Sequence, residues 1–385
     1  MGLSFEFATA TKIVFGEGKA KSLPQLLNGF GRRVLLVSGK NSSRHDYLVQ
    51  ALQRENFEVF RYVVASEPTT QHVSDGAGLA REKECTAIVG LGGGSAVDAA
   101  KAIAALAPNK GNLLDYLEVI GEGKPLEKKP LPFIAVPTTA GTGAEVTKNA
   151  VILSPEHKVK VSLRSDLMFP RVAVIDPELT LSMPPELTAA TGMDALTHLL
   201  ETFVSKQSNP FIDLLCREGM HRIASSLETA YEDGSNRIAR ADMAFAAMLG
   251  GIALANVKLG AVHGFAGPMG GMFPVPHGAV CAALLPAVMK INYKAVERER
   301  LQASIEKYNE LGRVLTGNTK AVAADGIVWV ERMLKKLQMP RLSSYGLEAS
   351  SFSILAEKAK NASSMKGNPV VLSDKELYEV LEMSG

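Results

Sequence analysis

The first half of the chain alternates short apolar runs with amphipathic stretches, and this alternation restricts the folds open to it. Runs long enough for buried strands lie at 34–38, 86–91, 131–136 and 171–175. Helical patterns separate them, at 46–56, 73–83 and 96–107. Strands that are apolar on both faces and alternate with helices are typical of a parallel sheet covered by helices on both sides. We therefore predict an α/β fold for this half.

After Asp176-Pro177 the apolar runs of strand length disappear and the pattern becomes helical. Helices are expected at 185–205, 210–231, 236–257, 279–292, 297–315, 320–337 and 373–383. With 385 residues, of which 46% are hydrophobic, the chain exceeds the length at which a single core stops growing. We predict an α/β domain over residues 1–180 and an all-helical domain over residues 181–385.

Composition narrows the class of partner and the compartment. Lys and Arg number 42 against 40 Asp and Glu, so the net charge of +2 provides no field suited to nucleic acid or an anionic membrane, and a small uncharged partner fits better. Cys85, Cys216 and Cys281 are odd in number and lack CxxC spacing, which favours buried thiols in a reducing compartment. The first residues do not form a secretory signal, and no stretch approaches ~18 uninterrupted apolar residues. We expect a cytoplasmic protein that does not span a membrane.

A glycine-rich turn, Gly92-Gly-Gly-Ser95, follows one expected strand and opens a helix. Ser95 is expected to cap that helix, with Asp98 where the acid of a capping box would stand. Three successive glycines let backbone N–H groups approach a diphosphate, and the helix N-terminus adds partial positive charge. The turn therefore predicts a phosphate site. The alternative is a plain strand-to-helix turn, and the spacing differs from the Rossmann fingerprint.

A second glycine-rich loop, Pro137-Thr-Thr-Ala-Gly-Thr-Gly-Ala-Glu-Val-Thr147, leaves the expected strand at 131–136. Small hydroxyl residues alternate with glycine, so the loop offers hydrogen-bond donors and close backbone approach. Taken alone it could be an ordinary polar loop. At the carboxyl end of a neighbouring strand, where ligands bind in open α/β sheets, it supports a nucleotide-binding sheet.

Two distant segments of the second half contain potential metal ligands. Asp194 and His198 are four residues apart in an expected helix, so both project from one face. His263 is expected to end one apolar helical stretch, and His277 to open another after Pro-Val-Pro. One carboxylate and three imidazoles suit Zn²⁺, Fe²⁺ or a similar divalent ion, with room for a substrate oxygen. Hydrogen-bonded core histidines remain the alternative, but three of only seven histidines fall in these segments.

Seven blocks occur in a specific order over nearly the whole chain. They are Phe15-Gly-Glu-Gly18, 90–101, 137–147, Asp176-Pro-Glu-Leu-Thr180, 192–198, 263–277 and Gly367-Asn-Pro369. In combination and in order they resemble the iron-dependent alcohol dehydrogenase family, which is related in fold to glycerol dehydrogenase and dehydroquinate synthase. The resemblance implies an NAD(P)-dependent alcohol dehydrogenase that assembles as a homodimer or higher homo-oligomer. It also implies a nicotinamide cofactor on the α/β half and a divalent metal in the helical half, across a cleft.

The resemblance assigns roles residue by residue. By resemblance, the metal ligands and catalytic residues are Asp194, His198, His263 and His277. The cofactor residues would be Gly93, Gly94, Ser95 and Asp98 at the pyrophosphate turn, Thr138, Thr139, Thr142 and Thr147 along the groove, Leu179 near the adenosine and Lys160 at the nicotinamide ribose. Asn149 and Leu254 are assigned to the substrate pocket.

Two positions depart from the family pattern. Many members have an Asp after the strand that here reads Val-Leu-Leu-Val, and its carboxylate bonds the ribose 2′-hydroxyl and repels a 2′-phosphate. Here Gly39 and Lys40 follow Ser38, so NADP is predicted to be accepted as well as NAD. Many members also carry a further histidine four residues after His263, where this chain has Gly267. A proton path through that ring is therefore excluded.

These residues predict hydride transfer between a nicotinamide and a small alcohol or aldehyde whose oxygen a metal ion polarises. A second hypothesis is a lyase of the dehydroquinate-synthase type, which calls for a Glu ligand with two histidines and a basic cluster for a phosphorylated acid. A third is a catalytically idle relative that binds nucleotide or acts as a scaffold, supported only by the loss of the histidine at Gly267.

Overall fold

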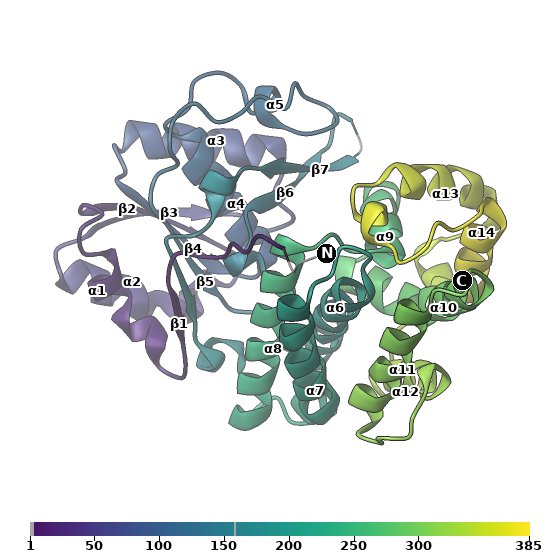
Figure 1. Ribbon diagram of the computed structural model, residues 1–385. Helices are drawn as coiled ribbons and strands as arrows, with labels where there is room; N and C mark the ends of the chain where they lie inside the picture. Colours follow the sequence, from purple (N-terminus) through teal and green to yellow (C-terminus); the bar gives the residue numbers. More distant parts are fainter. Residues whose placement is uncertain (1–3, 158) are drawn as a thin grey trace. The chain divides into compact units, whose positions relative to one another are not determined.

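The computed structural model describes residues 4–157 and 159–385, which divide into two compact units (Figure 1). The α/β unit comprises residues 8–139 and 143–181, and the helical unit comprises residues 182–385 together with 140–142 and the described residues up to Phe7. The sequence-based division at residue 180 placed these two short segments in the first domain, whereas by their contacts they group with the helices.

A six-stranded sheet, parallel throughout, forms the centre of the α/β unit, with strand order β1-β8-β5-β4-β2-β3. The strands are β1 (Ile13–Phe15), β2 (Arg33–Ser38), β3 (Glu58–Val63), β4 (Ala87–Gly92), β5 (Phe133–Pro137) and β8 (Val172–Ile175). The predicted parallel sheet is thus confirmed. Sequence patterning missed β1, which has three residues, and β3, a half-polar strand at the sheet edge.

Helices cover both faces of the sheet. Leu35 and Val37 of β2 face one apolar core, and Val34 and Leu36 face the other, as the period of two in a strand requires. The helices of the first face are α3 (Thr70–Glu82), α4 (Gly94–Leu106) and α5 (Leu113–Tyr116), and those of the second are α1 (Leu23–Leu27) and α2 (Asp46–Arg54). The strands are buried on both sides, which explains their continuous apolar sequences.

An antiparallel hairpin of β6 (Asn149–Ser154) and β7 (Val159–Arg164) follows the second glycine-rich loop. The ammonium of Lys101, fully buried in α4, donates to the carbonyls of Ala144 and Asn149 and to Thr147 Oγ1, at 2.7, 2.7 and 2.9 Å. A single buried lysine therefore ties α4 to the loop and to the start of the hairpin.

The helical unit is built around α6, which packs against α7, α8 and α10 (Figure 1). Its helices are α6 (Pro185–Val204), α7 (Pro210–Glu232), α8 (Arg237–Asn256), α9 (Ala261–Met272), α10 (His277–Arg298), α11 (Gln302–Thr316), α12 (Ala323–Lys336), α13 (Phe352–Asn361) and α14 (Asp374–Ser384). Short 3₁₀ turns are η1 (Lys19–Ser22), η2 (Ser42–His45), η3 (Ala144–Val146), η4 (Asp166–Met168) and η5 (Pro177–Thr180) in the α/β unit, and η6 (Leu342–Tyr345), η7 (Ala349–Ser351) and η8 (Ser364–Gly367) in the helical one. The described part of this unit contains no strand, as the sequence predicts.

Two helices, α8 and α10, are long and apolar enough to cross a membrane by length and composition alone. However, 67% and 72% of their apolar windows are buried inside the protein. Burial of this extent accounts for their composition without a membrane, so the two helices are weak evidence for a span.

Candidate metal centre and nucleotide site

One face of α6 carries three acidic or imidazole side chains. Asp194, His198 and Glu201 stand at positions i, i+4 and i+7, and each is at most 4% exposed. Thr197 and Thr202 beside them donate to the carbonyls of Met193 and His198 one turn earlier, so the helix buries these hydroxyls with partners. The helix therefore presents its charged groups, already desolvated, toward α9 and α10.

His263 lies in the first turn of α9, and the expectation that it ends a helix is wrong. The chain is apolar on both sides of this point, but α8 stops at Asn256 and α9 begins only at Ala261. The first N–H groups of α9 find partners far away in sequence: Ala261 N donates to Asn368 Oδ1, and Val262 N and His263 N donate to the two oxygens of Glu201. A helix start capped by distant side chains carries no local sequence signal.

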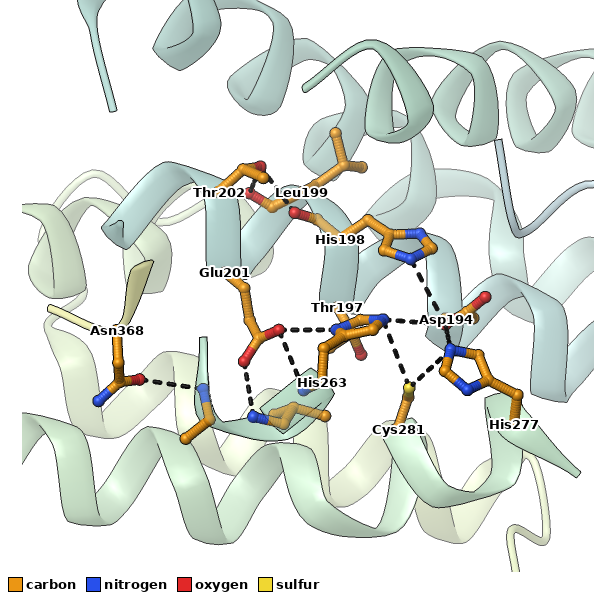
Figure 2. Close-up of polar contacts among 12 residues, drawn as sticks. Asp194, Thr197, His198, Leu199, Glu201, Thr202, His263, His277, Cys281 and Asn368 are labelled. Carbon is orange, nitrogen blue, oxygen red and sulfur yellow. Dashed lines mark hydrogen bonds and ion pairs between the residues drawn. The ribbon is translucent and has the colours of Figure 1, made fainter. Parts of the chain in front are cut away.

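Glu201 also fixes the ring of His263. The Nδ1 atom lies 2.7 Å from Glu201 Oε2, so Nδ1–H donates to the carboxylate (Figure 2). The lone pair of Nε2 then faces Asp194, whose Oδ1 is 3.6 Å away. A histidine oriented by a carboxylate in this way is the usual arrangement of a metal ligand.

His277 is the first residue of α10, as predicted, and its Nε2 lies 3.5 Å from Asp194 Oδ1. The next residue, Gly278, allows α10 to press against α6, because a Cβ there would lie 2.3 Å from the carbonyl oxygen of Ala190. The His277 side chain is 40% exposed, whereas those of His198 and His263 are nearly buried. The cluster is therefore reached from the side of His277.

Two further glycines hold the start of α9 in place. A Cβ on Gly260, which precedes α9, would lie 2.8 Å from Glu201 Oε1. A Cβ on Gly367, beside Asn368, would lie 2.0 Å from the carbonyl oxygen of Leu259. Only glycine permits these approaches, and they place the capping groups of Glu201 and Asn368 against the helix start.

The three imidazole nitrogens lie around Asp194 Oδ1 at distances close to those between ligands of one ion. Asp194 Oδ1 lies 3.8, 3.6 and 3.5 Å from Nε2 of His198, His263 and His277. Donors bound tetrahedrally at about 2.0–2.2 Å from a common ion are about 3.3–3.6 Å apart. Within the described residues, Asp194 Oδ1 is buried and accepts no hydrogen bond, which is costly unless a cation binds it. These residues fit a divalent metal ion: the ligand atoms of Asp194, His263 and His277 lie within 4.8 Å of one another, and His198 Nε2 lies 3.8 Å from Asp194 Oδ1.

The local electrostatics keep two of the donors, Asp194 and His198, in the form that binds a metal ion. Burial by itself raises the pKa of Asp194, but the imidazoles of His198, His277 and His263 outweigh it and lower that pKa well below its usual range. Burial lowers the pKa of His198 to about 3, although Asp194 opposes the shift. Asp194 is therefore a carboxylate and His198 a neutral imidazole, and metal ions bind these forms.

The sequence reasoning missed three polar residues in this cluster. Glu201 follows Asp194 and His198 at helical spacing, and Cys281 stands four residues after His277, so each could have been found from its spacing. Ligand atoms of Asp194, His263, His277 and Cys281 all lie within 4.8 Å of one another. Asn368 belongs to the Gly367-Asn-Pro369 block, but its partners could not be known without the fold. The Glu ligand expected for a synthase is absent from the described cluster, because Glu201 faces the outer nitrogen of His263.

The predicted nucleotide residues gather at the carboxyl ends of three adjacent strands. Gly39 follows β2, Gly92 ends β4, and Thr138, which follows β5, donates its N–H to the Gly92 carbonyl. A Cβ on Gly92, where φ is +159°, would lie 2.8 Å from the Ala96 Cβ and 3.4 Å from Gly39 N. From β2 the chain continues to β3 on one side of the sheet, whereas from β4 it continues to β5 on the other side. Ligands of open α/β sheets bind where the strand order reverses in this way.

The expected cap of α4 is wrong. The helix begins at Gly94 after Gly93, and none of the described side chains, Ser95 included, caps it. Asp98 instead accepts the N–H of Val151 in β6, at 3.0 Å, and lies 3.7 Å from the ammonium of Lys101. The N–H groups of Ala96 and Val97 donate to the Gly93 carbonyl, and the half-exposed turn before them lacks a side-chain cap, which suits the predicted phosphate site.

The other predicted residues occupy varied positions. Thr139 is half-buried, and its Cγ2 would be 3.3 Å from a Cβ on Gly93, while Lys40 is exposed. Lys160 pairs with Glu67 at 2.6 Å. Thr147 is buried and accepts a hydrogen bond from Lys101, and Leu179 is buried in the second core. Asn149 is the first residue of β6. Thr142 and Leu254 belong to the helical unit.

Comparison with known proteins agrees with this geometry. The family description "Iron-containing alcohol dehydrogenase" matches residues 10–177, and "Fe-containing alcohol dehydrogenase family, C-terminal" matches residues 188–385. The chain is similar to choline dehydrogenase of Bacillus subtilis (strain 168), with 32% identity over 96% of this chain and 92% of that one. It is similar also to NADPH-dependent butanol dehydrogenase of Clostridium saccharobutylicum, with 34% identity over 98% and 97%.

A solved structure of a 1,3-propanediol oxidoreductase has the same fold, with a TM-score of 0.92 and 31% identity over 100% of both chains. Both family descriptions together span nearly the whole chain, in the order that the sequence predicts. The chain belongs to the iron-containing alcohol dehydrogenase family.

Proposed function

We propose that this protein transfers a hydride between NADP(H) or NAD(H) and a small primary alcohol or its aldehyde. The proposal rests on one observation above all: the Nε2 atoms of three imidazoles lie 3.5–3.8 Å from the buried Oδ1 of Asp194, in a cluster that is reached from the side of His277. A divalent ion at this centre supplies Lewis-acid polarisation of the substrate oxygen.

The residues of the chain position the reactants. Asp194 and the three histidines would hold the ion, and Glu201 fixes the His263 ring so that its Nε2 stays aimed toward Asp194. The N–H groups at the start of α4 would hold the cofactor pyrophosphate, because the glycine turn lets it approach the backbone. The nicotinamide supplies the hydride chemistry.

We propose that NADP(H) is accepted and preferred. Gly39 has no side chain to repel a 2′-phosphate, and the exposed Lys40 beside it offers a positive charge. One relative, a butanol dehydrogenase, is described as NADPH-dependent, which supports this choice.

The substrate is proposed to be a short alcohol, since the similar proteins are described as acting on choline, butanol and 1,3-propanediol. Asn149 and Leu254 are proposed to contact it. Space is open at Gly267: outside its own helix backbone and chain neighbours, no atom of the described residues lies within 4 Å of a Cβ placed there. With no imidazole at this position, the proton is proposed to leave through the ribose hydroxyls and water.

The cellular compartment and the oligomeric state of the enzyme are also proposals. Cys85, Cys216 and Cys281 are free and buried, which suits a reducing, cytoplasmic compartment. Assembly as a homodimer or higher homo-oligomer is proposed from family membership.

A substrate panel tests the function. Purified protein with measured metal content is assayed with short aldehydes, alcohols and diols against NADPH and NADH. We expect turnover of at least one short aldehyde, its loss after chelation, and its return with Fe²⁺ or Zn²⁺. Undiminished turnover in fully metal-free protein would overturn the metal-dependent mechanism, and a metal-loaded protein without turnover would favour the idle relative.

A further inference from the structure

Cys281 lies at the metal centre although neither the function nor the predicted ligand set requires a thiol. It is fully buried on α10, one turn after His277. Its Sγ atom lies 3.7 Å from Nε2 of His263 and 3.7 Å from Nε2 of His277 (Figure 2). The sulfur therefore faces the same nitrogen atoms that are predicted to bind the ion.

These distances are in the range found between two ligands of a single ion. A sulfur at about 2.3 Å and a nitrogen at about 2.1 Å from one ion are about 3.1–3.8 Å apart for angles of about 90–120° at the ion. Cys281, Asp194, His263 and His277 offer ligand atoms that all lie within 4.8 Å of one another. Its spacing from the other ligand atoms therefore places the Cys281 Sγ atom as a donor to a metal ion.

A second, independent observation points to a cation at this position. Asp194 is 2% exposed, and its Oδ1 accepts no hydrogen bond from the described residues although it faces the cluster. The other two thiols have different surroundings. Cys216 contacts Thr202 Oγ1 at 3.3 Å, and Cys85 packs in a core of the α/β unit.

We propose that Cys281 is a further donor to the metal ion, which it binds as a thiolate together with Asp194 and the histidines. The proposal rests on the metal site of the proposed function. Binding releases the thiol proton to solvent. Because thiolate is a soft ligand, Cys281 shifts the preference of the site toward Zn²⁺ and Co²⁺ and away from Mn²⁺ and Mg²⁺.

Cobalt substitution tests this directly, since a thiolate bound to Co²⁺ produces a charge-transfer band in the near ultraviolet. Metal-free full-length protein is reloaded with Co²⁺ as wild type, Cys281→Ser, Cys281→Ala and, as a matched control, Cys85→Ala. We expect the band in wild type and Cys85→Ala, and its absence from both Cys281 variants while bound Co²⁺ remains measurable. By chelator competition, Zn²⁺ affinity should fall about tenfold or more relative to Mn²⁺ affinity in Cys281→Ala, about 1.4 kcal/mol.

The outcomes separate this proposal from the proposed function. A wild-type protein that binds Co²⁺ and reduces aldehydes but lacks the band overturns the role of Cys281 and leaves the function intact. A charge-transfer band that survives in Cys281→Ala also overturns the role of Cys281 as a metal donor. Failure of the wild type to bind any metal overturns both. Should the variants not fold, as judged by circular dichroism, the spectrum of the wild type decides alone.

Discussion

At the scale of single residues, Glu201 joins the backbone to the metal centre. One oxygen accepts the N–H of Val262, and the other accepts both the N–H of His263 and its ring Nδ1–H. The same carboxylate therefore starts α9 and orients a predicted ligand. Glu201 contacts the Nδ1 side of the His263 ring and is not among the clustered ligand atoms, so its role is positioning.

Glu201→Gln should weaken metal binding by about 10–100-fold, because the amide keeps the shape but presents N–H₂ to one of these donors. Zn²⁺ or Co²⁺ affinity measured by chelator competition checks this. Glu218→Gln, which alters an exposed carboxylate on α7 paired with Arg222, is the control and should bind metal normally. Unchanged affinity in Glu201→Gln would remove the positioning role.

Gly39 carries the prediction on cofactor choice. Among the described residues, no atom beyond the chain neighbours lies within 4 Å of a Cβ at this position, so space is open for Gly39→Asp. Its carboxylate would repel a 2′-phosphate and bond a 2′-hydroxyl, and we expect the kcat/KM ratio to shift toward NAD(H) by about tenfold or more, equivalent to about 1.4 kcal/mol. Steady-state kinetics with both cofactors measures the shift.

Gly78→Asp adds the same charge to α3, where a Cβ would likewise meet no described atom beyond its own helix backbone and chain neighbours, and serves as the control. It should leave the cofactor ratio unchanged. A wild-type enzyme strictly limited to NAD(H) would contradict the proposal before any variant is made.

At the scale of elements, α4 and the loop after β5 each contribute a buried ionisable side chain, Lys101 and Glu145. Glu145 in η3 is 4% exposed, and burial raises its pKa to about 7, with the attraction of Lys101 offsetting only part of the shift. In the unfolded chain this carboxyl ionises near 4.5. The folded protein therefore binds the extra proton between these two values, and stability falls as the pH rises through this window.

Glu145→Gln cannot ionise and should escape that loss. We expect its free energy of unfolding to match the wild type near pH 4 and to exceed it above pH 7 by on the order of 3 kcal/mol, from a pKa rise of about 2.5. Urea unfolding at a series of pH values checks this. Glu82→Gln, at an exposed position on α3, should differ little from wild type at every pH. A constant difference for Glu145→Gln across the series would show that the carboxyl is not protonated in the fold.

How well the sequence predicts an element depends on whether its signal is local. Strands β2, β4, β5 and β8 are buried on both faces, so their continuous apolar runs identify them. The hairpin of β6 and β7 mixes exposed and buried residues, and its position depends on Lys101, which looks like an ordinary helix lysine in the sequence.

The same distinction holds for the candidate site. Asp194 and His198 were found because one helix carries both, and the glycine turn because it interrupts a strong pattern. The start of α9 was misjudged because its caps, Glu201 and Asn368, come from other parts of the chain. Only tertiary structure brings such partners together.

At the scale of the whole molecule, all predicted metal ligands belong to the helical unit, while the glycine turn of β4 and α4 belongs to the α/β unit. Each unit has its own core, and the donors of the metal centre come from α6, α9 and α10 alone. Loss of metal should therefore leave nucleotide binding in place.

His263→Ala and His277→Ala should each lose bound metal and activity yet retain NADP(H) affinity within about twofold, since a twofold change is only about 0.4 kcal/mol. Metal content by elemental analysis and nucleotide affinity by calorimetry check both halves of the prediction. His221→Ala, which alters another helix of the same unit, is the control and should keep metal and activity. Full metal content in both ligand variants would move the site elsewhere.

Gly260, Gly278 and Gly367 supply no donor atom, yet each lies where a Cβ would strike the groups that arrange the donors. The consequence concerns how alleles and homologous genes are judged. A gene that encodes alanine at one of these positions would keep the complete ligand quartet and pass any inspection of ligands, while its product would assemble a distorted centre. Surveys that infer activity from donor residues alone would count such genes as functional enzymes.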